Sequence, residues 1–279
     1  MTATSIYQSR VTSAQEAVKA IKSGQRVFLT GNVSVPQKLL AALVEYAPNL
    51  KDVEICQALT VGSADYVGPK MEGHLRVNSM FISANIRKAV QEGLADFTPV
   101  LLSEFPLLFK RGILPLDVAI IHVSTPDEHG FCSLGVEVGL TKTAAESAKL
   151  VIAEVNEKMP RTLGDSFIHV SRLTHIVPVN YDIPELPMAD EGDAEIVQKV
   201  AGHVAGLIPD GATMQLGIGG IPDAVLKYLF DKKDLGIHTE LFSDGVIDLV
   251  NAGVLTNTRK SLHPGKIVSG FILGTKRLL

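Results

Sequence analysis

The chain is poor in cysteine, with Cys56 and Cys132 as its two thiols. Two thiols are too few for the disulfide framework of a small secreted domain, so we expect a reducing cytoplasmic location and two small buried side chains. Basic runs are also missing, and the net charge is −4. This charge distribution gives no support for a nucleic-acid partner.

Long apolar runs are missing as well. One of the longest, 114–123, contains Asp117 and His122 and is far shorter than the roughly 20 apolar residues of a membrane helix. Residues 1–10 lack the apolar core of a signal peptide. The sequence therefore predicts no membrane partner.

What the chain does contain is a repeated alternation of short β-rich runs with helical patterns. Its 279 residues are enough for two domains and a sizeable core. The pattern predicts strands at 26–30, 53–55, 77–82, 99–102, 117–123 and 150–155, and helices at 36–46, 86–92 and 104–110. Strands alternating with helices imply βαβ units, so we expect an α/β fold with largely parallel sheets.

A composition shift at 179–193, rich in proline and acidic residues, indicates a domain boundary. We place an N-terminal domain at 1–186 and a C-terminal domain at 187–279. The second domain is expected to hold helices at 194–207 and 244–251 and strands at 212–216, 236–241 and 266–273. Because no closing helix follows the last strand, we expect this domain to be incomplete.

An internal echo suggests that the two domains are related. Gly31 precedes Pro36 by five residues, as Gly217 precedes Pro222, and each proline opens a helical pattern after a strand. Eighteen residues past each proline stands a carboxylate, Glu54 or Glu240. Since all βαβ units look somewhat alike, coincidence stays open beside duplication.

The most informative stretch is a glycine loop followed by an acid. Gly217, Ile218, Gly219, Gly220 and Ile221 follow one predicted strand, and Glu240 ends the next. A right-handed crossover places the two strand ends at the same edge of the sheet, where ligands of parallel sheets bind. The glycines allow backbone N–H groups to approach a ligand, and a helix expected from Pro222 directs its positive end there.

Three interpretations of this stretch stay open on the residues alone. It is a structural turn with a solvated Glu240, or a dinucleotide site in which Glu240 binds a ribose hydroxyl, or a site in which Glu240 is a nucleophile. Pro222 stands where the dinucleotide fingerprint has its third glycine, which disfavours the second interpretation.

The residues resemble the acetyl-CoA hydrolase/transferase family. The resemblance is carried by 215–225, QLGIGGIPDAV, and 236–245, GIHTELFSDG, together with shorter matches at 30–32, 83–85, 126–130 and 163–165. It covers essentially the whole chain. It implies two related domains of the NagB/RpiA-like CoA-transferase type, a homodimer, and a further C-terminal part with more of the CoA site.

The same resemblance implies roles for individual residues. Glu240 matches the family's catalytic glutamate, and Gly217, Ile218, Gly219, Gly220 and Ile221 match a CoA-binding loop. The implied activity is acyl-CoA:carboxylate CoA transfer between short-chain acids such as acetate, butyrate or 4-hydroxybutyrate, through a glutamyl-CoA thioester. Coenzyme A is then a substrate, and no permanently bound cofactor is expected. Acetyl-CoA hydrolysis and an inactive CoA-binding or dimerising fragment are the alternatives.

Other polar residues receive structural interpretations. His122, His129 and Cys132 have only a loose metal-like spacing, so we expect no metal site. Ser243 and Asp244 are expected to cap the helix that follows them, and Asn85 the helix near 86.

Overall fold

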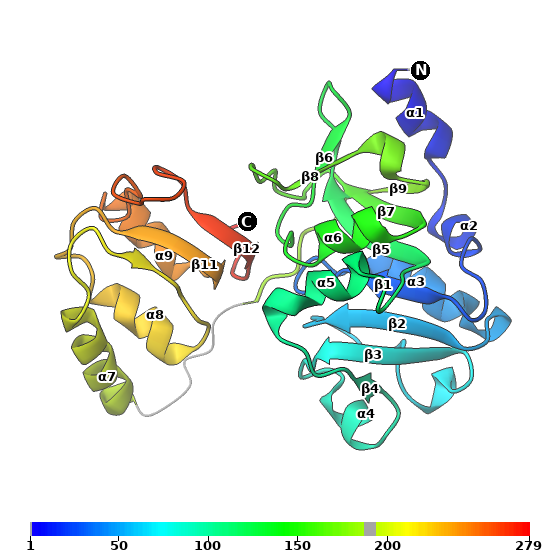
Figure 1. Ribbon diagram of the computed structural model, residues 1–279, viewed down its shortest axis with the longest axis horizontal. Helices are drawn as coiled ribbons and strands as arrows, with labels where there is room; N and C mark the ends of the chain where they lie inside the picture. The colour runs from blue at the N-terminus through cyan, green and yellow to red at the C-terminus, as the bar shows by residue number, and fades with distance from the viewer. Residues whose placement is uncertain (1, 187–193) are drawn as a thin grey trace. The chain divides into compact units, whose positions relative to one another are not determined.

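The computed structural model describes residues 2–186 and 194–279, which form two compact units, Met1–Pro184 (unit 1) and Glu185–Leu279 (unit 2) (Figure 1). The predicted boundary between residues 186 and 187 borders 187–193, which lie outside the described residues. The exact boundary therefore stays a prediction.

Unit 1 is built on a seven-stranded parallel sheet with the strand order β4-β3-β2-β1-β5-β7-β9. Two further strands, β6 and β8, form an antiparallel pair. The strands are β1 (Arg26–Leu29), β2 (Val53–Ala58), β3 (Leu75–Phe81), β4 (Asp96–Phe97), β5 (Val118–Ser124), β6 (Phe131–Ser133), β7 (Leu150–Asn156), β8 (Phe167–His169) and β9 (His175–Val179). The helices are α1 (Ala3–Arg10), α2 (Ala14–Val18), α3 (Gln37–Tyr46), α4 (Arg87–Gln91), α5 (Phe105–Lys110) and α6 (Thr141–Ser147).

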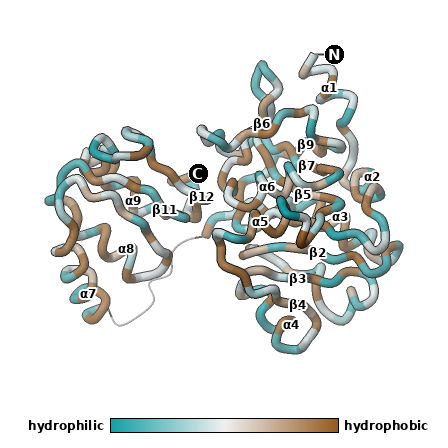
Figure 2. Tube along the Cα trace, viewed as in Figure 1, coloured by the Kyte–Doolittle hydropathy of each residue, from teal (hydrophilic) through white to brown (hydrophobic). Residues whose placement is uncertain are grey.

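Helices cover both faces of this sheet. Val27 and Leu29 point into a core shared with α2 and α3, whereas Phe28 points into a second core shared with α5 and α6. Side chains alternate along a strand, so strands between two helical layers bury both of their faces and are mainly apolar. All seven residues of β5 are buried, as the sequence predicted. Figure 2 shows the corresponding apolar runs along β5 and β7. The α/β fold with largely parallel sheets is confirmed.

The predicted strand at 99–102 was wrong. The strand here is the short β4, which pairs with β3 only at Asp96 and Phe97. Pro99 has no N–H to donate, so the ladder ends before it. The chain then enters a 3₁₀ turn at Leu102–Glu104.

Unit 2 holds a three-stranded parallel sheet in the order β10-β11-β12. Its strands are β10 (Thr213–Met214), β11 (Gly236–Phe242) and β12 (Val268–Ile272), and its helices are α7 (Ala194–Gly206), α8 (Gly220–Lys227) and α9 (Gly245–Asn251). Right-handed crossovers place α8 and α9 on one face of the sheet. Met214 and Ile237 share a core with residues of all three helices on that face. Throughout the described part of the chain, every helix is too short or too polar to span a bilayer.

Both cysteines are small buried side chains, as predicted. Burial raises the pKa of Cys132 to about 12, and burial also raises the pKa of Cys56. Neither thiol therefore ionises near neutral pH.

Candidate functional site

Glu240 is the fifth residue of the seven-residue strand β11, near its carboxyl end. Burial alternates along this strand: His238 and Glu240 are exposed, whereas Ile237, Thr239 and Leu241 are buried. The carboxylate of Glu240 therefore stands on the sheet face opposite the helix-covered core.

The glycine loop lies beside Glu240. Met214 of β10 pairs with Ile237 of β11, and the chain leaves this ladder after Met214 on its way to the glycine loop. Beyond the ladder, Thr239, the residue before Glu240, bonds to Leu216, the residue before Gly217: Thr239 Oγ1 lies 2.9 Å from the Leu216 nitrogen and 3.0 Å from its carbonyl oxygen. The structure thus brings together the loop and the acid that the sequence singled out.

The loop has an unusual backbone at Gly219, whose φ is +119°. Few residues other than glycine adopt such a value, and here it lets Gly219 form the N-cap of α8. The helix begins at Gly220, so the expectation that it begins at Pro222 was wrong. Proline is tolerated as the third residue because the first four N–H groups of a helix have no intrahelical acceptor. Ile218 and Ile221 are both exposed, at 47% and 43%.

Ser243 and Asp244 do not cap α9 through their side chains, which corrects the sequence prediction. The buried Ser243 hydroxyl instead donates to Asp223 Oδ1 of α8 at 2.8 Å. Asp244 accepts the Thr275 N–H at 2.8 Å and the Thr275 hydroxyl at 2.6 Å. The end of β11 is therefore bonded to the start of α8 and to the loop after β12.

Glu54, the proposed echo of Glu240, lies elsewhere on its strand. It is the second residue of β2, where its carboxylate accepts from Arg26 Nε at 2.7 Å and Asn78 Nδ2 at 2.8 Å. Burial opposes ionisation of Glu54, but the hydrogen bonds from Arg26 and Asn78 outweigh it and hold the pKa of this carboxyl below its usual value. Glu54 is thus an ion-pair partner near the amino end of its strand.

The echo fails because its two prolines occupy different positions. Pro36 precedes α3 as its N-cap, whereas Pro222 is the third residue of α8. Eighteen residues after Pro36 lies the second residue of β2, whereas eighteen residues after Pro222 lies the fifth residue of β11. The fifth residue of β2, matching Glu240, is the buried Gln57, which accepts the Tyr66 hydroxyl at 2.7 Å. That the two domains are related stays a prediction.

Asn85 is not a helix cap either. The residue before α4 is Ile86, and no side chain caps that helix. The Asn85 amide donates to the Gly62 carbonyl at 3.1 Å, and its oxygen accepts the Ser83 hydroxyl at 2.6 Å. Asn85 thus links the loop after β3 to the loop after β2 by a hydrogen bond.

His122, His129 and Cys132 occupy dissimilar environments. His122 is buried on β5 with Nε2 3.1 Å from Asn156 Nδ2, Cys132 is buried on β6, and His129 lies exposed in the connecting loop. Burial lowers the pKa of His122 to about 4. Within 2–186 and 194–279, no three His, Cys, Asp or Glu side chains gather as a metal site.

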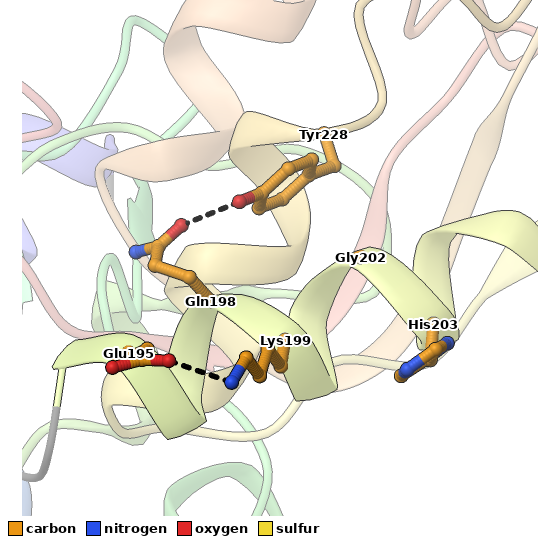
Figure 3. Close-up of a pocket in the computed structure, with 6 residues that line it drawn as sticks. All are labelled: Glu195, Gln198, Lys199, Gly202, His203 and Tyr228. Atoms are coloured by element: carbon orange, nitrogen blue, oxygen red, sulfur yellow. Dashed lines mark hydrogen bonds and ion pairs between the residues drawn. The ribbon is translucent and has the colours of Figure 1, made fainter.

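A shallow hollow of about 680 Å³ lies on the helical side of unit 2 (Figure 3). It is lined by Glu195, Gln198, Lys199, Gly202, His203 and Tyr228. Lys199 pairs with Glu195 at 2.6 Å, and the Tyr228 hydroxyl donates to Gln198 at 2.8 Å. Four of its polar side chains are thus bonded in two pairs, and its residues come from α7 and the end of α8, not from the strand of Glu240.

The sequence analysis did not predict the hydrogen bonds that Thr239 and Asp244 make around the site. Thr239 does carry a sequence signal. On a strand with alternating faces it shares a face with the apolar Ile237 and Leu241, so its hydroxyl must point into the core. For Asp244 the usual signal of a helix cap pointed to the wrong partner, since Thr275 stands 31 residues further along the chain.

Comparison with known proteins shows which family the chain is similar to. Residues 1–186 match the family described as acetyl-CoA hydrolase/transferase N-terminal domain. The chain is 50% identical to the 4-hydroxybutyrate coenzyme A transferase of Clostridium kluyveri over 273 residues, covering 98% of this chain and 63% of that protein. It is 45% identical to the succinyl-CoA:acetate/propanoyl-CoA:succinate CoA transferase of Fasciola hepatica, covering 95% of this chain and 55% of that protein.

A solved structure is similar over nearly the whole length of this chain. The crystal structure of 4-hydroxybutyrate CoA-transferase from Porphyromonas gingivalis superimposes with a TM-score of 0.86 at 39% identity, covering 99% of this chain and 65% of that one. The chain thus spans about three fifths of the length of these relatives. On its sequence match and its fold, the chain belongs to the acetyl-CoA hydrolase/transferase family.

Proposed function

We propose that this chain carries the nucleophile and part of the CoA site of an acyl-CoA:carboxylate CoA-transferase. The observation that supports this most directly is the exposed Glu240 at the carboxyl edge of a parallel sheet, directly after Thr239, which bonds to the residue before the glycine loop. Ligands of parallel α/β sheets bind at that edge. An accessible acid beside a glycine loop suits attack on a large thioester.

In the first half-reaction the Glu240 carboxylate attacks the acyl-CoA carbonyl carbon. The C–S bond breaks, giving an acyl-glutamyl anhydride and CoA thiolate. The thiolate then attacks the glutamyl carbonyl, releases the first carboxylate and leaves a glutamyl-CoA thioester. Dividing one difficult exchange into easier steps is the usual gain of covalent catalysis.

In the second half-reaction an acceptor carboxylate attacks the thioester and forms a new anhydride with release of CoA thiolate. The thiolate attacks the acyl carbonyl of that anhydride, which yields the new acyl-CoA and restores Glu240. The two acids bind in turn, so the scheme predicts ping-pong kinetics.

The loop before α8 supports the proposal through its backbone. Gly219 and Gly220 lack side chains that would hold a ligand away from their N–H groups, and α8 directs the positive end of its dipole toward this loop. Such donors stabilise a developing oxyanion or bind CoA. The exposed Ile218 and Ile221 add apolar surface for the CoA chain.

The substrates are proposed as short-chain acids and their CoA thioesters. Relatives are named for 4-hydroxybutyrate, for succinate, acetate and propanoate, and, at 36% identity, for butyrate and acetate. An acetyl-CoA hydrolase of Neurospora crassa is also similar, at 27% identity over 62% of this chain. Hydrolysis therefore stands as the second candidate, in which water replaces the acceptor acid. The homodimer and the cytoplasmic location stay predictions.

Trapping the thioester tests the mechanism. The chain is incubated with acetyl-CoA or butyryl-CoA and then with borohydride, which reduces a glutamyl thioester to an alcohol. Peptide mass spectrometry should locate the alcohol at Glu240, and the variant Glu240→Gln should show none. Glu195→Gln, a change of an exposed acid on α7, is the matched control and should behave like the unchanged chain.

Because relatives are longer, the same experiment is run on a protein of their full length that contains this chain. Trapping in both shows that the described residues suffice for the first half-reaction. Absence of the alcohol in both would reject Glu240 as the nucleophile. Conversion of labelled butyrate into labelled butyryl-CoA in the presence of acetyl-CoA identifies a transferase, whereas release of acetate from acetyl-CoA without added acceptor identifies a hydrolase.

A further inference from the structure

Thr239 stands directly before Glu240 but points to the opposite face of β11. It is 8% exposed, while both of its strand neighbours, His238 and Glu240, are exposed. A hydroxyl buried under the helical layer requires hydrogen-bond partners, because leaving it without them is costly.

The partners of this hydroxyl belong to the segment that leads into the glycine loop. Thr239 Oγ1 accepts the Leu216 N–H at 2.9 Å and lies 3.0 Å from two acceptors, the carbonyl oxygens of Leu216 and Leu241. One hydroxyl holds one proton, so it donates to one of these carbonyls at a time. The side chain therefore bonds to the residue immediately before Gly217.

This bond lies where the strand ladder has stopped. β10 and β11 pair only at Thr213 and Met214, and the chain leaves the ladder at Gln215. A bond from a side chain to Leu216 thus extends the connection between the two strands by two residues. It ends at Leu216, the residue that leads into the glycine loop.

We propose that Thr239 is a positioning residue, which fixes the distance between the Gly217 loop and the Glu240 carboxylate. The proposal rests on the function proposed above, since it concerns how that site is assembled. Thr239 acts through Leu216 on one side and through its own backbone on the other. Misplacement of a reacting group by ~1 Å can reduce a rate by about 100-fold.

Three substitutions at one position separate the roles of the side chain. Thr239→Val keeps the size and branching but removes the hydroxyl, and Thr239→Ser keeps the hydroxyl but loses a methyl group. Thr239→Cys replaces Val if the latter unfolds under the conditions used. Thr256→Val is the matched control, because the Thr256 hydroxyl also bonds within unit 2, to Asp234 Oδ1 at 3.1 Å.

Hydrogen exchange tests the positioning without reference to catalysis. The Leu216 amide donates to Thr239, so its exchange should accelerate about tenfold or more in Thr239→Val, as expected for the loss of ~1.4 kcal/mol of protection. Thr239→Ser and Thr256→Val should leave it near the original rate. An unchanged Leu216 rate in Thr239→Val would reject the proposal.

Kinetics then connect the bond to the reaction. In the full-length protein, Thr239→Val should lower kcat for thioester formation about 10- to 100-fold, with Thr239→Ser restoring most of it. Equal losses in Thr239→Val and Thr256→Val would show a general loss of stability and reject the positioning role. If the unchanged protein forms no thioester at Glu240, the proposed function fails, while the exchange rates still decide whether Thr239 holds the loop.

Discussion

Asp244 and Thr275 are joined by two hydrogen bonds, one from the Thr275 N–H and one from its hydroxyl, at 2.8 and 2.6 Å. Asp244→Ala removes both acceptors from a half-buried position. We expect unit 2 to lose about 1–3 kcal/mol of stability, which urea denaturation measures.

Asp248→Ala provides the comparison. Asp248 pairs with Arg277, two residues after Thr275, but both side chains of this pair are exposed. Exposed pairs contribute little, so the urea midpoint should stay where it is. A similar midpoint for both variants would contradict the structural role given to Asp244.

The glycine loop predicts a contrast between two alanine substitutions. A Cβ at Gly217 would meet its nearest neighbour, Pro222 Cγ, at 3.6 Å, which is ordinary contact. Gly217→Ala should therefore fold normally but weaken CoA binding about tenfold, since it places a methyl group beside Glu240. Gly219→Ala should instead lose roughly 1–3 kcal/mol of stability, because φ at Gly219 is +119°.

Thermal unfolding and calorimetric titration with CoA measure the two effects separately. The loop assignment would be wrong if Gly217→Ala bound CoA as tightly as the unchanged chain. The backbone argument would be wrong if Gly219→Ala were the more stable of the two variants.

His122 predicts a pH dependence of stability. Burial lowers its pKa from 6.5 to about 4, so between these values the unfolded chain binds a proton that the folded chain does not. Stability is therefore fully present above about pH 6.5 and falls as the pH decreases toward 4, by up to ~3 kcal/mol. Urea unfolding across this range measures the slope.

His122→Gln should flatten that slope, although it also lowers stability at neutral pH by disturbing the contact with Asn156. His129→Gln changes an exposed histidine and should keep the original slope. A slope unaffected by His122→Gln would show that other groups govern the acid sensitivity.

Gly31 and Gly202 predict opposite effects of the same substitution. A Cβ at Gly31 would lie 2.0 Å from the backbone oxygen of Ala58, so Gly31→Ala must displace a strand end and should cost about 2 kcal/mol or more. Gly202 lies within α7, and nothing approaches its Cβ position within 4 Å. Gly202→Ala should stabilise unit 2 by roughly 0.5–1 kcal/mol, as thermal unfolding can show.

The sequence predicted best the elements whose residues are set by burial. The strands β5 and β7 follow from mainly apolar runs, which a strand between two helical layers requires. β9 was not predicted; it contains Pro178, and a proline within a run argues against a strand. β9 is the last strand of the sheet, where an exposed proline is tolerated; on its outer side the Ile176 carbonyl accepts the Thr12 N–H, at 2.9 Å, in an isolated bridge.

The position of the glycine loop at the same sheet edge as Glu240 was also predictable, since a right-handed crossover places both strand ends there. The hydrogen bonds around them were not. Thr239 and Asp244 bond to groups of the chain far along the sequence, and a hydroxyl or carboxyl side chain carries no local sign of a distant partner. Local capping rules therefore assigned Asp244 to its nearest helix.

The strand order of unit 1 also constrains how it folds. β1 joins the half-sheet of β2, β3 and β4 to the half-sheet of β5, β7 and β9, yet its pairing with β5 connects Val27 to Val118. During synthesis on the ribosome, about 90 residues must be added after β1 before β5, its second neighbour in the sheet, has been made. Such non-local pairing slows folding and exposes an apolar strand edge in the meantime. The nascent chain should thus depend on chaperones most strongly between the synthesis of β4 and β5.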